Sequence, residues 1–168
     1  MSPRWWPFRS EREGLPDDWT AVASRHLRHW TVLGPTERRV LGQRTLDLYA
    51  DKRWEAARGF TLNDRMRCTI AVQAGLLALG LDGDCYRHVQ AIIVHPTTKV
   101  LHGPRPGPAP GVVTDEPMPV LGLAQDRRGP VVLAWDAIER HGRGGRQGHN
   151  VVFHEFAHKL DMLSGCLL

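Results

Sequence analysis

The sequence has 168 residues, which is enough for one domain of ordinary size. Hydrophobic residues make up 42% of it and charged residues 24%, values close to globular averages that exclude wholesale disorder. The longest apolar stretch, residues 68–81, is too short to cross a bilayer, which excludes a transmembrane protein. The net charge is +4, but basic and acidic residues are interleaved, which argues against a nucleic-acid-binding protein.

The N-terminus and the cysteines indicate a cytoplasmic protein. The first residues, MSPRWWPFRSERE, contain no apolar segment before their charges, so we expect no secretory signal. Three cysteines at wide spacing, Cys68, Cys85 and Cys166, fit neither a disulfide framework nor a cysteine-based zinc module.

The first half of the chain is predicted to be helical after a tail at residues 1–15. Residues 17–30 have a loosely helical pattern of apolar positions. A stronger helix is predicted from Thr36, as N-cap, to about residue 51. A third is predicted over 61–80, with Thr61 and Asp64 as a capping box, and its apolar residues indicate that it is buried.

The second half is predicted to form a small sheet followed by a helix. Residues 103–111, GPRPGPAPG, are expected to form a loop, and 136–140 a short helix. Strands are predicted at 88–95, at 99–101 as a partner of 88–95, and at 112–113, 120–123 and 131–135. Helices, then a sheet, then a helix predict an α+β fold.

The last predicted helix, from an N-cap at Asn150 to about Leu163, contains the motif that carries chemistry, HExxH. His154 and His158 are four residues apart and therefore lie on one helix face, where both imidazoles can reach one zinc ion. Glu155 is rotated off that face, so it can accept a proton from a zinc-activated water and deliver it to a leaving amine.

The segment around this motif resembles a known family. Residues 148–163, GHNVVFHEFAHKLDML, look like the signature of the Mlc titration factor A (MtfA) family of zinc peptidases. Three upstream segments resemble the same family, so that the likeness covers roughly residues 15 to 165: DRMR with IAVQA (64–67 and 70–74), VQAIIVHP (89–96) and GPVVLAWD (129–136).

The resemblance implies a zincin-like metallopeptidase fold similar to the catalytic domain of anthrax lethal factor. It implies a cytoplasmic, zinc-dependent peptidase of small peptides with aminopeptidase activity, in which His154 and His158 are zinc ligands and Glu155 is the catalytic base. In enteric bacteria, members of the family bind the Mlc repressor. A non-catalytic regulator that binds a transcriptional repressor of Mlc type is therefore the alternative function.

The resemblance also implies a third zinc ligand, a glutamate on a later helix, and no residue of this sequence matches that position. The chain stops ten residues after His158. We therefore expect a truncated protein whose catalytic domain, residues 16–168, lacks its C-terminal part. Since two histidines hold zinc more weakly than three protein ligands, we expect its peptidase activity to be impaired.

Several residues near the motif have two interpretations. As a functional residue, Asp161 either orients a histidine or serves as a third ligand. As a structural residue, it is an acid at the helix end that pairs with a basic neighbour. Cys166 is expected to be a free thiol, and His149 to form hydrogen bonds in the loop before the helix. Residues 131–133 with Trp135 form either an edge strand that pairs with an extended peptide or an interior strand.

Overall fold

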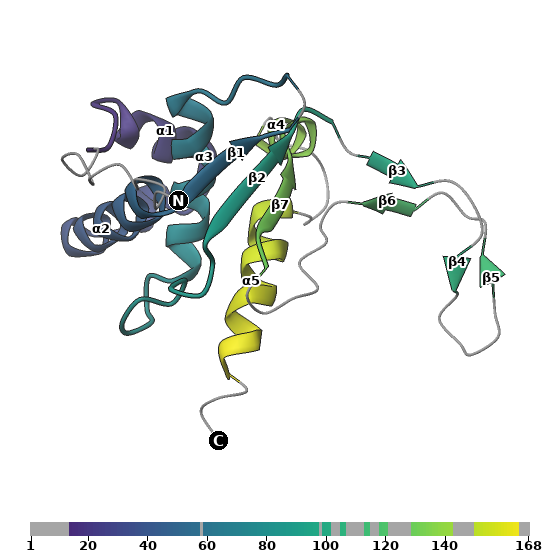
Figure 1. Cartoon of the computed structure of the whole chain (residues 1–168). Coiled ribbons are helices and arrows are strands. Elements are labelled where there is room, and N and C mark those ends of the chain that lie inside the picture. Colours follow the sequence, from purple (N-terminus) through teal and green to yellow (C-terminus); the bar gives the residue numbers. More distant parts are fainter. Residues whose placement is uncertain are drawn as a thin grey trace, which may run out of the picture.

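The computed structural model describes residues 14–57, 59–97, 99–101, 105–106, 113–114, 118–120, 129–142 and 150–164. These residues have the predicted α+β composition, with a three-stranded sheet packed against helices and two short strand pairs that extend away from it (Figure 1). No helix in the described ranges combines the length and apolarity needed to span a membrane. Most of the predicted tail at 1–15 lies outside the described residues, as do Cys166 and His149.

The central sheet is entirely parallel. Its strand order is β1 (Arg53–Ala56), β2 (Ala91–His95) and β7 (Val131–Ala134), with Ile92 opposite Val131. Parallel strands need long crossover connections, and a helix supplies the one between β1 and β2. The sequence analysis did not predict β1: its four residues, RWEA, alternate polar and apolar side chains, but the stretch is short and directly follows a helix. Strand 88–95 begins three residues later than predicted.

The two remaining strand pairs correct the predicted partner of 88–95. Strand β3 (Lys99–Leu101) pairs antiparallel with β6 (Met118–Val120), and β4 (Arg105–Pro106) with β5 (Val113–Thr114). The prediction that 99–101 pairs with 88–95 was therefore wrong, since β1 and β7 already flank β2. Within the predicted loop 103–111, residues 105 and 106 are in strand conformation.

The predicted helix over 17–30 is two elements, α1 (Trp19–His26) and a short 3-10 turn, η1 (Trp30–Val32). The helical conformation ends at Leu27, whose backbone is extended and whose side chain is buried. Helix α2 (Pro35–Asp51) has Gly34 as its N-cap, not Thr36. Pro35 is suited to the first helical position, and the Glu37 carboxylate accepts a hydrogen bond from the Gly34 amide at 2.7 Å.

Helix α3 (Asp64–Leu77) has Asn63 as its N-cap, not Thr61, and the Asn63 side chain accepts a hydrogen bond from the Met66 amide at 2.9 Å. It ends before Gly80, and residues 78–80 form a turn. Helix α4 (Trp135–Gly142) begins directly after β7, so Trp135 belongs to the helix and not to the predicted strand. The last helix, α5 (Val151–Ser164), agrees with the predicted 150–163.

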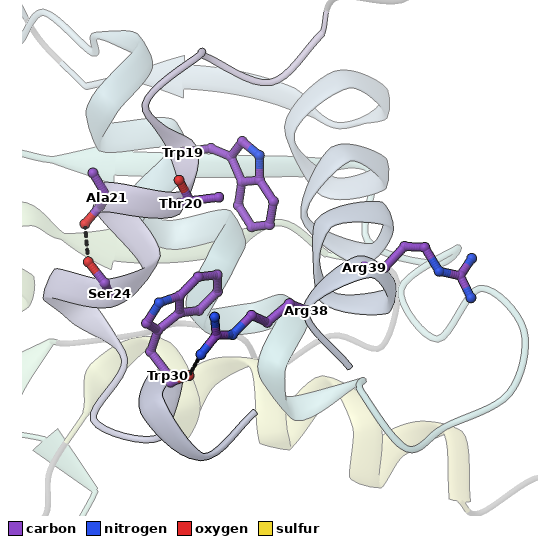
Figure 2. A pocket seen from close by; sticks show the side chains of 7 residues that line it. All are labelled: Trp19, Thr20, Ala21, Ser24, Trp30, Arg38 and Arg39. Carbon is purple, nitrogen blue, oxygen red and sulfur yellow. Dashed lines mark hydrogen bonds between the residues drawn. The ribbon is translucent and has the colours of Figure 1, made fainter. Parts of the chain in front are cut away.

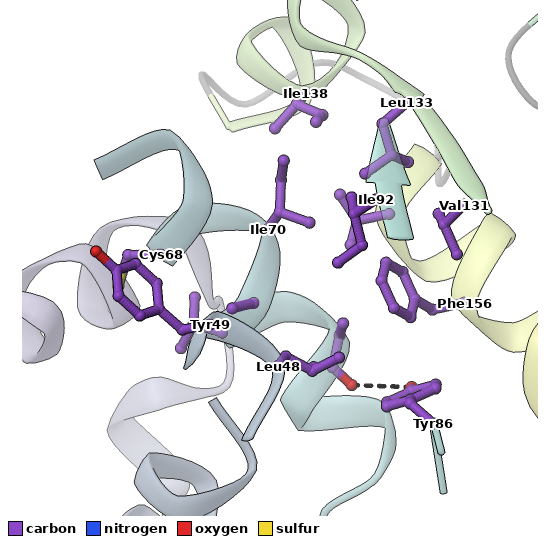
Figure 3. Packing of buried hydrophobic residues seen from close by; sticks show 14 of the residues in the cluster. Leu48, Tyr49, Cys68, Ile70, Tyr86, Ile92, Val131, Leu133, Ile138 and Phe156 are labelled. Carbon is purple, nitrogen blue, oxygen red and sulfur yellow. Dashed lines mark hydrogen bonds between the residues drawn. The ribbon is translucent and has the colours of Figure 1, made fainter. Parts of the chain in front are cut away.

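The helices and the sheet share one hydrophobic core. Ile70 of α3, Ile92 of β2 and Phe156 of α5 lie close together in it, and all three are fully buried (Figure 3). Beyond this core, the N-terminal helices form an open hollow of their own (Figure 2). There Trp19 and Trp30 meet edge to face, and the Arg38 guanidinium lies 4.6 Å above the Trp30 ring.

Candidate metal centre

The N-terminus of α5 is fastened to the buried helix α3. The Asn150 side-chain oxygen accepts a hydrogen bond from the Phe153 amide at 3.1 Å, which confirms Asn150 as the N-cap. Its side-chain nitrogen donates to the Gln73 side-chain oxygen at 2.6 Å. Gln73 is only 4% exposed, so this bond satisfies a polar group that lies inside the core. The HExxH helix therefore starts at a defined point.

One side of α5 is packed and the other faces outward. Val152 and Phe156 are fully buried, and the Phe156 ring meets the Tyr86 ring edge to face at 5.1 Å. Tyr86 in turn donates a hydrogen bond from its hydroxyl to the Ala74 carbonyl of α3 at 3.0 Å (Figure 3). His154 and His158 are exposed on the opposite side. This packing fixes the rotation of α5 about its own axis.

The two histidines of the motif converge. Their Nε2 atoms are 3.1 Å apart, and their rings stand nearly perpendicular, with centroids 4.5 Å apart. Two nitrogen ligands at about 2.05 Å from a tetrahedral metal ion are about 3.3 Å apart. The observed separation is close to this value. The pair therefore has the chemistry and the spacing of two metal ligands.

Glu155 lies on the buried side of the same turn and is only 4% exposed. Burial raises the pKa of its carboxyl above the usual range, although the neighbouring His154, His158 and Lys159 act in the opposite direction. A carboxylate whose pKa is raised binds a proton more strongly than a solvated one. Glu155 is therefore suited to act as a general base beside the histidine pair.

A buried lysine that the sequence analysis did not single out ties α5 to the sheet. Lys159 is fully buried, and its ammonium donates a hydrogen bond to the Gly129 carbonyl at 3.0 Å, two residues before β7 begins. Its position four residues after Glu155, next to the apolar side of the helix, was the available signal. Gln73 could have been singled out in the same way, since it is a polar residue within the apolar stretch 68–81.

No third ligand joins the histidine pair within the described residues. Among them, no group of three or more His, Cys, Asp or Glu side chains is placed to hold a metal ion. Asp161 is exposed on the last turns of α5 and does not complete such a group. Tyr86 is engaged in the core, so it is not directed at the histidine pair.

Strand β7 lies at an edge of the described sheet, because it pairs with β2 on one side only. Of the two interpretations of residues 131–133, the described part of the chain therefore agrees with an edge strand. Its backbone is close to α5, since Lys159 contacts the residue two positions before the strand.

Comparison with known proteins assigns the chain to a family. Residues 3–167 match the sequence profile of Peptidase_M90, glucose-regulated metallo-peptidase M90. The chain belongs to this family. Membership supports a metallopeptidase-type function and implies a divalent metal ion.

The similar proteins are longer than this chain. It is 33% identical to "Uncharacterized protein slr2042" of Synechocystis over 98% of its own length and 61% of the relative. It is 30% identical to Mlc titration factor A of Klebsiella pneumoniae, over 95% of its length and 59% of the relative. The corresponding protein of Salmonella typhi is 27% identical, with the same coverage. The chain thus spans about 60% of these relatives.

Proposed function

We propose that this chain carries the catalytic helix of a zinc-dependent metallopeptidase of aminopeptidase type, with a zincin-like fold similar to the lethal factor catalytic domain. The observation that carries the proposal is the pair of imidazole Nε2 atoms 3.1 Å apart beside a buried glutamate. We further infer a cytoplasmic location from the three widely spaced cysteines, of which Cys68 and Cys85 are free thiols.

In this proposal His154 and His158 hold the metal through Nε2, and α5 keeps them in place through its contacts with α3. A bound zinc ion polarises a peptide carbonyl and lowers the pKa of a water molecule. Glu155 accepts a proton from the attacking water on a carboxylate oxygen and transfers it to the leaving amine nitrogen. Because Glu155 is buried, most of its carboxyl is shielded from bulk water.

Strand β7 is proposed to align the substrate. Its outer edge, which has no partner strand among the described residues, can pair with an extended peptide by backbone hydrogen bonds. The bond from Lys159 to the Gly129 carbonyl holds the residues before that strand against the HExxH helix. In this proposal the bond keeps the position of the substrate backbone fixed relative to the histidine pair.

The test is cleavage of an amino-acid anilide by the purified 168-residue chain with one equivalent of zinc. We expect weak or no cleavage, because the described residues supply two ligands and a catalytic zinc usually has three. Zinc-dependent cleavage at a rate typical of a complete enzyme, lost in Glu155→Gln, would refute the expected impairment. Such cleavage would support the assigned residues.

A second candidate function is binding of a transcriptional repressor of Mlc type. Its support is that similar proteins are named Mlc titration factor A. The test is a pull-down of a homologous repressor by this chain. Binding that survives His154→Ala would support a regulator that uses the HExxH helix only structurally. No binding, together with stoichiometric zinc, would favour the peptidase.

A further inference from the structure

A second polar site lies where three helix ends meet, outside the histidine pair. A cavity of about 280 Å³, open to solvent, is lined by residues from the end of α1 and the first turns of α3 and α4. The residues that line it and matter here are Arg25, His26, Asn63, Arg65, Trp135 and Glu139. Trp135 directly follows β7, so the cavity adjoins the carboxyl end of a parallel strand.

Two arginines bring positive charge to the cavity. Arg25 and Arg65 form no ion pair within the described residues. Burial, and after it the charges of these two arginines, lower the pKa of His26, so all three groups influence one another across a short distance. The His26 Nδ1 atom is buried and has no hydrogen-bond partner in the described structure. Because this nitrogen is closed to a water-sized group, it does not serve as a donor to a ligand in the cavity.

The start of α3 adds to this positive potential. Asn63 is the N-cap of this helix of 14 residues, and helix N-termini attract anions through their free amides and their dipole. The nearest acidic residue of α3, Asp64, is already paired with Arg67 at 2.7 Å. Glu139 of α4 is the one acidic group among the described lining residues. The balance of the lining therefore favours an anion.

We propose that this cavity binds a small organic phosphate. Its charged donors, Arg25 and Arg65, come from two different helices, and a phosphate group presents three oxygens that such separate donors can share. A carboxylate, in contrast, is satisfied by one arginine in a bidentate pair. Trp135 supplies an aromatic surface for the apolar part of the ligand. This site is independent of the metal chemistry proposed for α5.

The test compares three probes by calorimetry at constant ionic strength: phenyl phosphate, inorganic phosphate and benzoate. The protein is first stripped of metal with a chelator, because phosphate and carboxylate also bind zinc. We expect phenyl phosphate to bind most tightly and benzoate most weakly. Benzoate binding as tight as phenyl phosphate, or the absence of saturable binding, would overturn the proposal. Equal affinity for inorganic phosphate would overturn the role of Trp135.

Charge variants locate the site. Arg25→Gln and Arg65→Gln should each weaken phenyl phosphate binding about fivefold, the scale of a solvent-accessible ion pair. Glu139→Gln should strengthen it, since it removes the opposing charge. The matched control is Arg39→Gln, which removes an exposed arginine that lines the hollow of Figure 2 instead. Equal weakening by Arg39→Gln would show binding by net charge alone and would contradict the assigned site.

Discussion

The hydrogen bond between Asn150 and Gln73 should contribute measurably to the stability of the fold, because it fastens α5 to α3. Asn150→Ala removes the helix N-cap, which costs about 1 kcal/mol, and leaves the Gln73 side-chain oxygen buried without a donor, which costs about 1–3 kcal/mol more. The free energy of unfolding should therefore fall by about 2–4 kcal/mol. For a chain of this size the melting temperature should fall by about 5–15 °C.

A double-mutant cycle, measured by urea unfolding followed with circular dichroism, separates the two contributions. In a Gln73→Met background, Asn150→Ala should lower the free energy of unfolding only by the loss of the N-cap, about 1 kcal/mol, because the Gln73 side-chain oxygen is no longer present. Asn150→Asp keeps the capping oxygen and loses the donor to Gln73, so it should fall between wild type and Asn150→Ala. Equal costs of Asn150→Ala in both backgrounds would refute the reasoning.

Three further predictions concern groups elsewhere in the fold. Burial raises the pKa of Cys68 to about 12, so iodoacetamide at pH 8 should label it only after unfolding, as read by peptide mass spectrometry. Burial lowers the pKa of His26, so the unfolded chain binds more protons than the native one and stability should fall below about pH 6.5 in phosphate-free buffer. A Cβ at Gly75 would lie 3.3 Å from the backbone of α2, so Gly75→Ala should destabilise the fold by about 1–2 kcal/mol despite its better helix propensity.

Each of these predictions has a matched control. Cys85 is 8% exposed and should be labelled before Cys68, and equal labelling of Cys68 in native and unfolded protein would contradict its burial. His26→Gln should reduce the loss of stability in acid, whereas the same change at exposed His29 should not. Gly80→Ala, where an added Cβ meets no atom within 4 Å, should be close to neutral. A more stable Gly75→Ala variant would show that α2 and α3 can separate without cost.

The sequence predicted those parts of the site that depend on spacing along one helix. HExxH implied that His154 and His158 share a face, and their Nε2 atoms are in contact distance. Asn150 was predicted as the N-cap, because a capping side chain acts only over its own helix turn. The packing of Phe156 on the inner side of α5 follows from the same periodicity.

The features that the sequence did not predict depend on contacts between distant segments. The partner of Asn150 is Gln73, which is 77 positions away, and local pattern does not report such a pair. Strand β1 has only four residues and pairs parallel with β2, a partner more than 30 positions away that so short a local pattern does not report. The partner of 99–101 was assigned incorrectly for the same reason, since the sheet register is decided by tertiary contacts.

Zinc binding by the 168-residue chain tests the central claim most directly. Isothermal titration of metal-free protein should give one zinc per chain, and His154→Ala or His158→Ala should each weaken binding at least about tenfold. Glu155→Gln should weaken binding less than either histidine variant, because this carboxyl lies beside the ligands and is not one of them. Zinc binding that survives the loss of both histidines, or that disappears with Glu155→Gln, would contradict the account.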